Sequence, residues 1–277
     1  MLNILYVILC GIALPVGGVQ MQYLWRNQLG DIYSLGLGSA ACLGAATATM
    51  TGWCSLTVGA FICQAVCALI VSLVAIRLNT SRLITFGILF GTFVGSLGTI
   101  VVTNAPTGDL LKQYYLWGAA NFKLQGVTTL DIVISLLLFA AGIATALLCS
   151  KKLTSHFKGE LELSNAAKAG ILFMISVLVT SVVSICGTIG FVSLGVPNLV
   201  RALVKPGDIR KQYAWSALLG TALLFITYII VEYCNFGIYL PVSATMALIA
   251  LPLTFVLFSK EKTNVPQGMP ESRQSSE

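Results

Sequence analysis

The chain has 277 residues, of which 57% are hydrophobic and only 9% are charged. Since a soluble globular domain carries about 25% charged residues, this composition excludes an ordinary water-soluble fold. The net charge of +6 does not indicate a nucleic-acid partner, because the basic residues form short clusters between long apolar runs, as membrane-orientation signals do.

Nine apolar segments are predicted to cross a lipid bilayer as helices. A bilayer core of about 30 Å needs about 20 apolar residues per helix, and the alternating pattern of a membrane β-barrel is absent. The segments are 2–24, 33–49, 54–76, 83–104, 128–149, 169–187, 188–204, 213–234 and 239–258. The predicted fold is therefore an all-α integral membrane protein, a bundle of about nine transmembrane helices that includes short or broken ones.

Two boundaries in this scheme need a reason. The stretch 169–204 exceeds one crossing, and Gly187, Gly190 and Gly195 offer break points, so we divide it into two spans. The second is expected to be short and bent at Pro197. In the one substantial outside loop, 105–127, Asp109 to Trp117 is expected to form a short interfacial helix.

The distribution of basic residues predicts the orientation. With the N-terminus outside, fourteen basic residues fall on one side and two on the other, whereas a single span at 169–204 would give seven against nine. The positive-inside rule therefore favours nine spans and a cytoplasmic C-terminus. We expect a membrane domain at 1–259 and a disordered cytoplasmic tail at 260–277, which is rich in polar residues, Pro, Gly and Ser.

Catalytic chemistry finds little support in the sequence. Intramembrane ionisable residues usually mark ion coupling, and the candidates, Asp131 and Glu232, lie near the outer ends of their spans. His156 lies in a predicted cytoplasmic loop without a partner pattern. No phosphate-binding loop, nucleophile motif or Cys/His zinc spacing is present. We therefore predict no catalytic residue, no metal site and no cofactor.

Small residues form the clearest pattern inside the spans. Gly87, Gly91, Gly95 and Gly98 follow one another at helical spacing, and a second cluster lies at 36–44. Such spacing lets helix backbones approach closely in lipid. The pattern is typical of tight bundle packing, and it also suits helices that slide during gating.

Several dispersed motifs carry a family resemblance. They are Gly18, Gln22, Arg26, Asn27, Gln28, Leu29, Gly30 and Asp31; Leu35, Gly36, Ser39 and Ala41; Thr80 to Leu83; Leu116 to Gly118; Gly187 to Val192; and Val196 to Arg201. In this order they make the sequence resemble the FecCD family. Those proteins are permeases that import iron-siderophores, haem and cobalamin with a separate ATPase and an external binding protein.

The resemblance implies a function and a set of functional residues. This chain would be the permease subunit of an ABC importer in the bacterial inner membrane, working as a homodimer, with ATP hydrolysis on a partner chain. The cytoplasmic gate would comprise Asn27, Leu29, Thr80 and Ser81, which are also ordinary helix-capping residue types. Contact with the ATPase would involve Lys158, Gly159, Glu160, Ala166, Lys168 and Gly170.

The sequence also departs from the family pattern. The family's first span and the Arg-x-Pro-Arg element after it are expected to have no counterpart here, and Gln28 and Ile32 replace two prolines. Glu232 stands where the family presents an external arginine that receives the binding protein. Two alternatives therefore stay open: an ion-coupled secondary transporter, and a decayed membrane subunit that no longer transports. No motif specifies the chelate.

Overall fold

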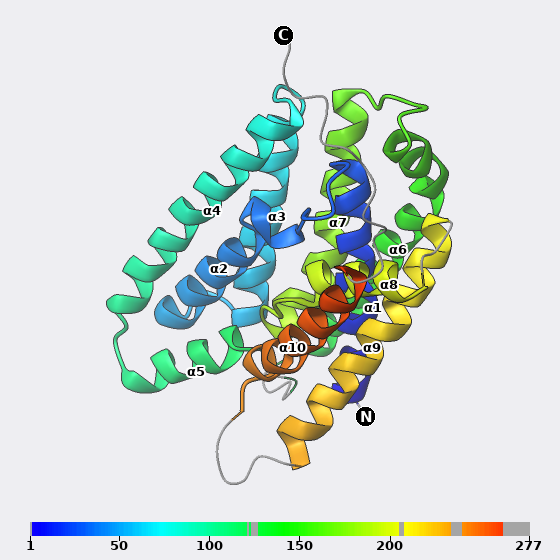
Figure 1. Ribbon diagram of the computed structural model, residues 1–277. Helices are drawn as coiled ribbons and strands as arrows, with labels where there is room; N and C mark the ends of the chain where they lie inside the picture. Colours follow the sequence, from blue (N-terminus) through cyan, green and yellow to red (C-terminus); the bar gives the residue numbers. More distant parts are fainter. Residues whose placement is uncertain (1, 121, 123–126, 205–207, 234–239, 263–277) are drawn as a thin grey trace.

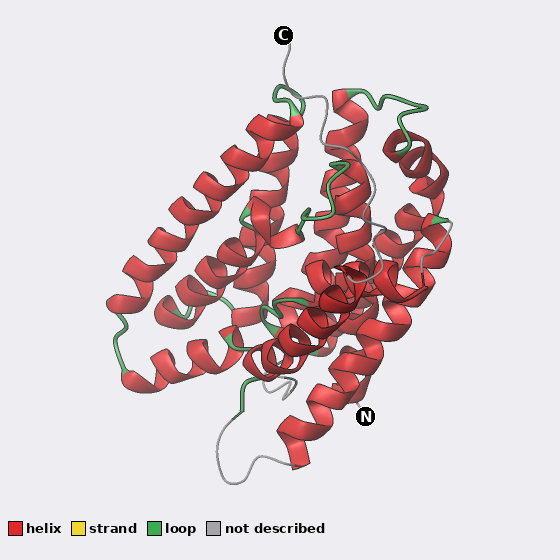
Figure 2. Cartoon of the chain, viewed as in Figure 1, coloured by secondary structure: helices red, strands yellow, loops and turns green. Residues whose placement is uncertain are grey.

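The computed structural model describes residues 2–120, 122, 127–204, 208–233 and 240–262. Within these residues every regular element is a helix (Figure 2). In chain order they are α1 (Leu2–Leu24), the 3-10 turn η1 (Ile32–Leu35), α2 (Leu37–Thr51), α3 (Leu56–Ala75), α4 (Thr80–Thr103), α5 (Gly108–Gly118), α6 (Thr129–Phe157), α7 (Asn165–Cys186), α8 (Val192–Val204), α9 (Ile209–Tyr233) and α10 (Val242–Lys262).

This architecture confirms the predicted all-α membrane bundle. In the described part of the chain, six helices are long and apolar enough to cross a membrane, namely α1, α3, α4, α6, α7 and α9, and α8 and the first half of α10 are shorter apolar helices. The number nine is therefore approximate. α10 continues to Lys262, and the rest of the expected tail, 263–277, lies outside the described residues.

The breaks between helices follow from local backbone chemistry. Gly187 ends α7 with a φ of +81°, a value that glycine adopts without a side-chain clash, and this confirms the division of 169–204. Gly36, with a φ of +79°, ends η1 before α2, so the predicted span 33–49 is a 3-10 turn plus a helix. α5 is the short helix that was expected between α4 and α6.

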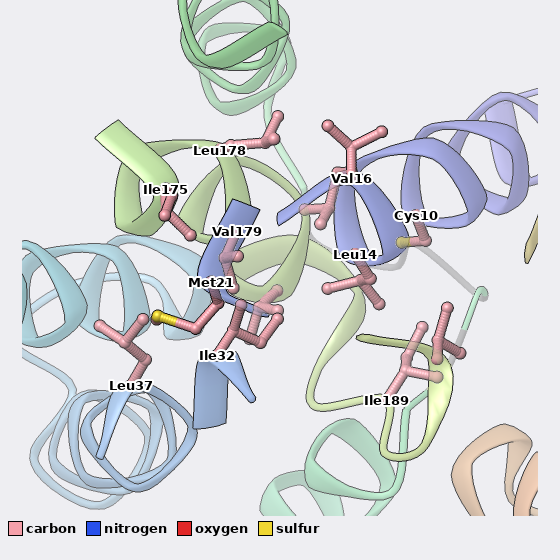
Figure 3. Packing of buried hydrophobic residues seen from close by; sticks show 14 of the residues in the cluster. Cys10, Leu14, Val16, Met21, Ile32, Leu37, Ile175, Leu178, Val179 and Ile189 are labelled. Atoms are coloured by element: carbon pink, nitrogen blue, oxygen red, sulfur yellow. The ribbon is translucent and has the colours of Figure 1, made fainter. Parts of the chain in front are cut away.

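α1 and α7 form the centre of the bundle (Figure 1). Most of their residues are buried, whereas α4, α6 and α9 are mostly exposed although they are as apolar. Figure 3 shows Met21 of α1 close to Ile175 and Val179 of α7, with Ile32 of η1 beside them. Apolar surface that the bundle leaves exposed faces lipid or a partner helix, so the peripheral helices form the outer wall.

The glycines of α4 pack this helix against η1 and α2. A Cβ at Gly91 would lie 2.9 Å from Cα of Gly36, and one at Gly87 would lie 2.8 Å from the carbonyl oxygen of Ser34. Contacts this close require glycine. The stripe is therefore a packing surface, tightest at Gly87 and Gly91, as the first of the two interpretations of the sequence predicts.

Gly91→Ala is expected to destabilise the protein by about 1–2 kcal/mol. Overpacking typically costs about 1–3 kcal/mol, which exceeds the gain of up to about 1 kcal/mol from replacing glycine by alanine in a helix. Thermal unfolding of the detergent-solubilised protein measures the change. Gly108→Ala is the control, because a Cβ there meets nothing within 4 Å. A Gly91→Ala protein as stable as wild type would contradict this packing argument.

Two groups of connections lie at opposite ends of the molecule. In Figure 1 the α3–α4 turn and the α6–α7 link lie at the upper end, and the α4–α5 link and the start of α1 lie at the lower end. The upper end carries Arg77, Lys151, Lys152 and Lys158. We call it the basic end. These four residues belong to the fourteen that the sequence predicts on one side of the membrane.

Candidate functional site

Two motif segments far apart in the sequence meet where α1 ends. Gly18 touches α8 so closely that a Cβ would overlap the carbonyl oxygen of Ser193. The Arg201 guanidinium of α8 donates a hydrogen bond to Oε1 of Gln22. The Ser193 hydroxyl donates to the Asp31 carboxylate at 2.5 Å. The segment between α1 and η1, which contains two gate candidates, is therefore fixed to α8 at both of its ends.

Asn27 and Leu29 have different positions within this segment. Oδ1 of Asn27 accepts a hydrogen bond from the Leu29 backbone N–H at 2.9 Å, so Asn27 holds the turn through its own side chain. The Leu29 side chain is 74% exposed, which is unusual for a large apolar residue on a tight turn. Asn27 shapes the turn, and Leu29 is the side chain that it presents.

The second pair of gate candidates begins α4. The helix cap is Asn79, whose Oδ1 accepts from the Arg82 backbone N–H at 3.1 Å, so capping falls to the residue before Thr80. Ser81 lies in the exposed first turn. Trp25 and Asn79 line the same pocket, and the structure therefore brings the two predicted gate segments to one region of the basic end.

The predicted ATPase-contact residues occupy the α6–α7 link, which holds Lys158, Gly159 and Glu160, and the first turns of α7, which hold Ala166, Lys168 and Gly170. Lys158 caps the C-terminus of α6, and Gly159 turns the chain with a φ of +80°. Five of the six candidates are exposed: Lys158, Gly159, Glu160, Ala166 and Gly170. Lys168 is half-buried, because its ammonium group binds Glu162. The link and the start of α7 thus present an accessible surface at the basic end of the molecule.

Glu162 organises this link and was not singled out from the sequence. Its carboxylate lies 2.8 Å from Nη2 of Arg26 and 2.8 Å from Nζ of Lys168. The hydrogen bond from Lys168, with the nearby Arg26 charge, lowers the pKa of Glu162. One exposed carboxylate thereby ties the end of α1, which leads into the gate segment, to the start of α7.

His156 lies in the last turn of α6 instead of a loop, which corrects the sequence-based placement. Its side chain is only 2% exposed. Nε2 lies 3.2 Å from the Leu24 carbonyl oxygen and Nδ1 lies 3.2 Å from Nη2 of Arg26. Nδ1 also lies 3.1 Å from the Leu161 carbonyl oxygen, so the ring joins the ends of α1 and α6 to the α6–α7 link. The predicted span ended at residue 149 where charges begin, but the helix continues to Phe157 because a helix can extend beyond the bilayer.

α4 carries an exposed row of hydroxyl groups along its membrane-spanning length. The row comprises Thr85, Thr92, Ser96, Thr99 and Thr103. It lies between the glycine face that contacts α2 and an exposed apolar stripe formed by Leu89, Phe93, Leu97 and Ile100. The hydroxyls donate to backbone carbonyls of their own helix, as Ser96 does to Thr92 at 2.9 Å. Each oxygen keeps acceptor capacity toward the outside of the helix.

The two acidic residues near the outer ends of spans have ordinary surroundings. Asp131 forms a capping box with Thr128 at the start of α6, with hydrogen bonds of 2.9 and 3.2 Å. This structural role explains its burial. Glu232 is exposed in the last turn of α9, at the end of the molecule opposite to the α6–α7 link (Figure 1).

The class of protein follows from these features. The molecule is a bundle of apolar helices in which Gly187 separates α7 from the short helix α8. Loops gather at its basic end, and an exposed helix carries a row of hydroxyl groups. These features are typical of a multi-pass membrane permease. The profile of the FecCD transport family matches residues 1–260. The chain belongs to this family, whose members are permease subunits of ABC transporters and not enzymes, and which work with ATPase and substrate-binding partners.

Individual relatives agree with this assignment. The chain is 27% identical over 270 residues to the ABC transporter permease protein YvrB of Bacillus subtilis, covering 91% of this chain and 75% of the relative. It is 29% identical to the hemin transport system permease protein HmuU of Yersinia pestis, covering 81% and 71%. It is 28% identical to the vitamin B12 import system permease protein BtuC of Escherichia coli, covering 93% and 81%.

A solved structure confirms the fold. A metal-chelate type ABC transporter in an inward-facing conformation superposes with a TM-score of 0.83 at 22% sequence identity, covering 94% of this chain and 85% of that one. At this level of identity the comparison establishes the architecture alone.

Proposed function

We propose that this chain imports a metal chelate of the siderophore, haem or cobalamin class as the permease subunit of a bacterial inner-membrane ABC importer. The observation that carries the proposal is the agreement of relatives whose names specify hemin, iron(3+)-hydroxamate and vitamin B12, at 28–29% identity. These cargoes differ in shape but share a bulky ligand around a metal ion.

The hydroxyl row of α4 suits such a cargo. In a homodimer, two copies of this face would line a pathway between the subunits. Their hydroxyl protons are already donated to backbone carbonyls, so the wall is wettable but offers only weak acceptors. A wall without fixed charges lets a bulky chelate pass without holding it tightly, and the energy would come from ATP hydrolysis on the partner.

The proposed orientation places the basic end and the C-terminus in the cytoplasm, with a membrane domain at 1–259 and a disordered tail at 260–277. The arrangement of basic loops supports it. The α6–α7 link would then face the ATPase, and Glu232 would face the external binding protein. In a Cys-depleted variant carrying Glu160→Cys, a membrane-impermeant thiol reagent should label the protein only after the cells are opened. Labelling in intact cells would overturn this orientation.

Reconstituted transport tests the function. The chain, an ATPase subunit and a binding protein from the same genome are placed together in proteoliposomes, and ATP-dependent uptake of hemin, ferric hydroxamate and cobalamin is measured. We expect uptake of one of these cargoes and none without the ATPase. Uptake driven by an ion gradient alone, or uptake of none of the three, would contradict the proposal.

Glu232 is proposed to influence docking of the binding protein. It carries a negative charge where the family presents arginine, so a binding protein with acidic docking residues would meet a like charge. Glu232→Arg should strengthen binding to such a partner several-fold at low salt, mainly through faster association. The gain should shrink at high salt, because exposed charges are screened beyond about 10 Å at 0.1 M. Surface-binding measurements across a salt series decide this, and equal binding of both proteins at low salt would remove Glu232 from the docking surface.

A further inference from the structure

A pocket of about 330 Å³ opens at the basic end of the bundle. It lies between the ends of α1 and α3 and the starts of α4 and α7. The apolar side chains that line it include Leu24, Leu83 and Leu172, which are at most 5% exposed. Three cationic side chains, Arg77, Arg82 and Lys168, also line it. The pocket therefore combines an apolar floor with a basic rim.

The basic rim has unused capacity for an anion. Among the residues that the structure describes, none of those that line the pocket is acidic. Lys168 is paired with Glu162 at 2.8 Å, but in the described part of the chain neither Arg77 nor Arg82 forms an ion pair with an acidic residue. A guanidinium group presents donors in a planar fork that matches the oxygens of a phosphate group. Two such groups near one opening favour a phosphate-bearing ligand.

An exposed apolar stripe on α3 leads to this pocket. It consists of Ile62, Val66, Leu69, Leu73 and Ile76, which are 39–55% exposed and recur at alternating steps of four and three residues. The stripe ends beside Arg77. Asn165 of α7 donates a hydrogen bond to the Ile76 carbonyl oxygen at 3.0 Å, which fixes the end of the stripe at the pocket. A ligand with an anionic head and an apolar chain fits both surfaces.

We propose that this pocket binds the headgroup of an anionic phospholipid, with an acyl chain lying along the α3 stripe. The apolar length of α3 supports a lipid: the helix is long and apolar enough to cross a membrane, so we expect its end at Ala75 near headgroup level. Basic pockets between membrane helices bind such headgroups. A free phosphate would use the basic rim but leave the apolar stripe uncovered. The site is independent of the transported cargo, and it adjoins the predicted gate segments through Trp25 and Asn79.

The test compares lipid binding by wild type and by Arg77→Gln/Arg82→Gln. The purified protein is titrated with a fluorescent phosphatidylglycerol and with a phosphatidylcholine that carries the same label. Each basic residue near a membrane surface contributes about 1 kcal/mol toward an anionic lipid, which corresponds to about fivefold. We therefore expect wild type to prefer phosphatidylglycerol by about tenfold or more, and the double variant to lose most of this preference.

Lys151→Gln/Lys152→Gln is the matched control. It removes the same charge from exposed residues of α6 at the same end of the molecule, so it should keep the preference. In wild type alone, unlabelled phosphatidylglycerol should displace the probe, while phosphatidylcholine, inorganic phosphate and glycerophosphoglycerol should not. This arm remains informative if the double variant fails to fold.

Four outcomes would overturn the proposal. They are equal binding of the two labelled lipids by wild type, an equal loss of preference in the control, displacement of the probe by inorganic phosphate, and an unchanged lipid preference in Arg77→Gln/Arg82→Gln. The third would indicate a free anion as the ligand. The fourth, if this variant also loses the co-purifying ATPase, would assign the basic rim to a protein partner.

Discussion

Thr92→Trp/Ser96→Trp should lower ATP-dependent cargo uptake about tenfold or more while the assembled complex still hydrolyses ATP. Both residues belong to the exposed hydroxyl row of α4, the face proposed to line the pathway in a homodimer. Indole groups there would narrow the pathway and remove its wettable surface. Each additional barrier of about 1.4 kcal/mol to the passage of a bulky cargo lowers the rate about tenfold.

Phe93→Trp/Leu97→Trp is the matched control for this experiment. Phe93 and Leu97 lie one residue further along, on the apolar stripe of the same helix, and are 60% and 38% exposed. Bulk on a surface that faces lipid should leave uptake nearly unchanged. Equal loss of uptake in both double variants would show that α4 tolerates no added bulk on either face. Unchanged uptake in Thr92→Trp/Ser96→Trp would show that the hydroxyl row does not line the pathway.

Lys158→Glu/Lys168→Glu should reduce co-purification of the ATPase by about tenfold or more. The change reverses one charge in the α6–α7 link, at Lys158, and one in the first turn of α7, at Lys168. Reversal at Lys168 also places a second carboxylate beside Glu162, which in the wild type binds Lys168 at 2.8 Å. Loss of close charge pairs at an interface costs about 2 kcal/mol or more. Affinity chromatography through a tag on the ATPase measures the loss, and coupled ATP hydrolysis should fall in parallel.

Lys151→Glu/Lys152→Glu controls for net charge, because these residues are exposed on the preceding part of α6. It should retain the ATPase. If both double variants lose the ATPase equally, the effect is one of overall charge and the link is not the contact surface. Retention of the ATPase by Lys158→Glu/Lys168→Glu would also contradict the proposed contact.

The bridge made by Glu162 should also depend on pH in one direction. The pKa of the Glu162 carboxyl is lowered in the folded protein. The stabilisation that this carboxylate gives to the folded link is therefore fully present above the unfolded-state pKa of about 4.3. It is lost as the pH falls through the lower pKa of the folded state. Protease cleavage of the α6–α7 link should therefore remain slow down to about pH 4 and increase only below it. Glu162→Gln lacks the carboxylate at every pH, so we expect its α6–α7 link to be cleaved rapidly already at neutral pH.

Much of the fold could be predicted from the sequence, because a membrane-spanning helix is recognised by the summed hydropathy of consecutive residues. The predicted segments 2–24, 54–76 and 83–104 match α1, α3 and α4 within a few residues, since each is bounded by polar or turn-forming residues. The break at Gly187 was equally readable, because a glycine between two apolar runs permits a positive φ. Dispersed motifs along the chain also allowed the family to be inferred.

The contacts between segments were decided by tertiary structure. A glycine stripe indicates close approach, but only the rotation of α4 in the bundle shows that this stripe meets η1 and α2, and that the adjacent hydroxyl row stays exposed. Likewise, Arg26 and Glu162 are 136 residues apart, and no local property of either residue predicts that they pair. Hydropathy and turn preference belong to single segments, whereas pairing depends on how whole helices rotate and pack, so the first could be read from the sequence and the second required the fold.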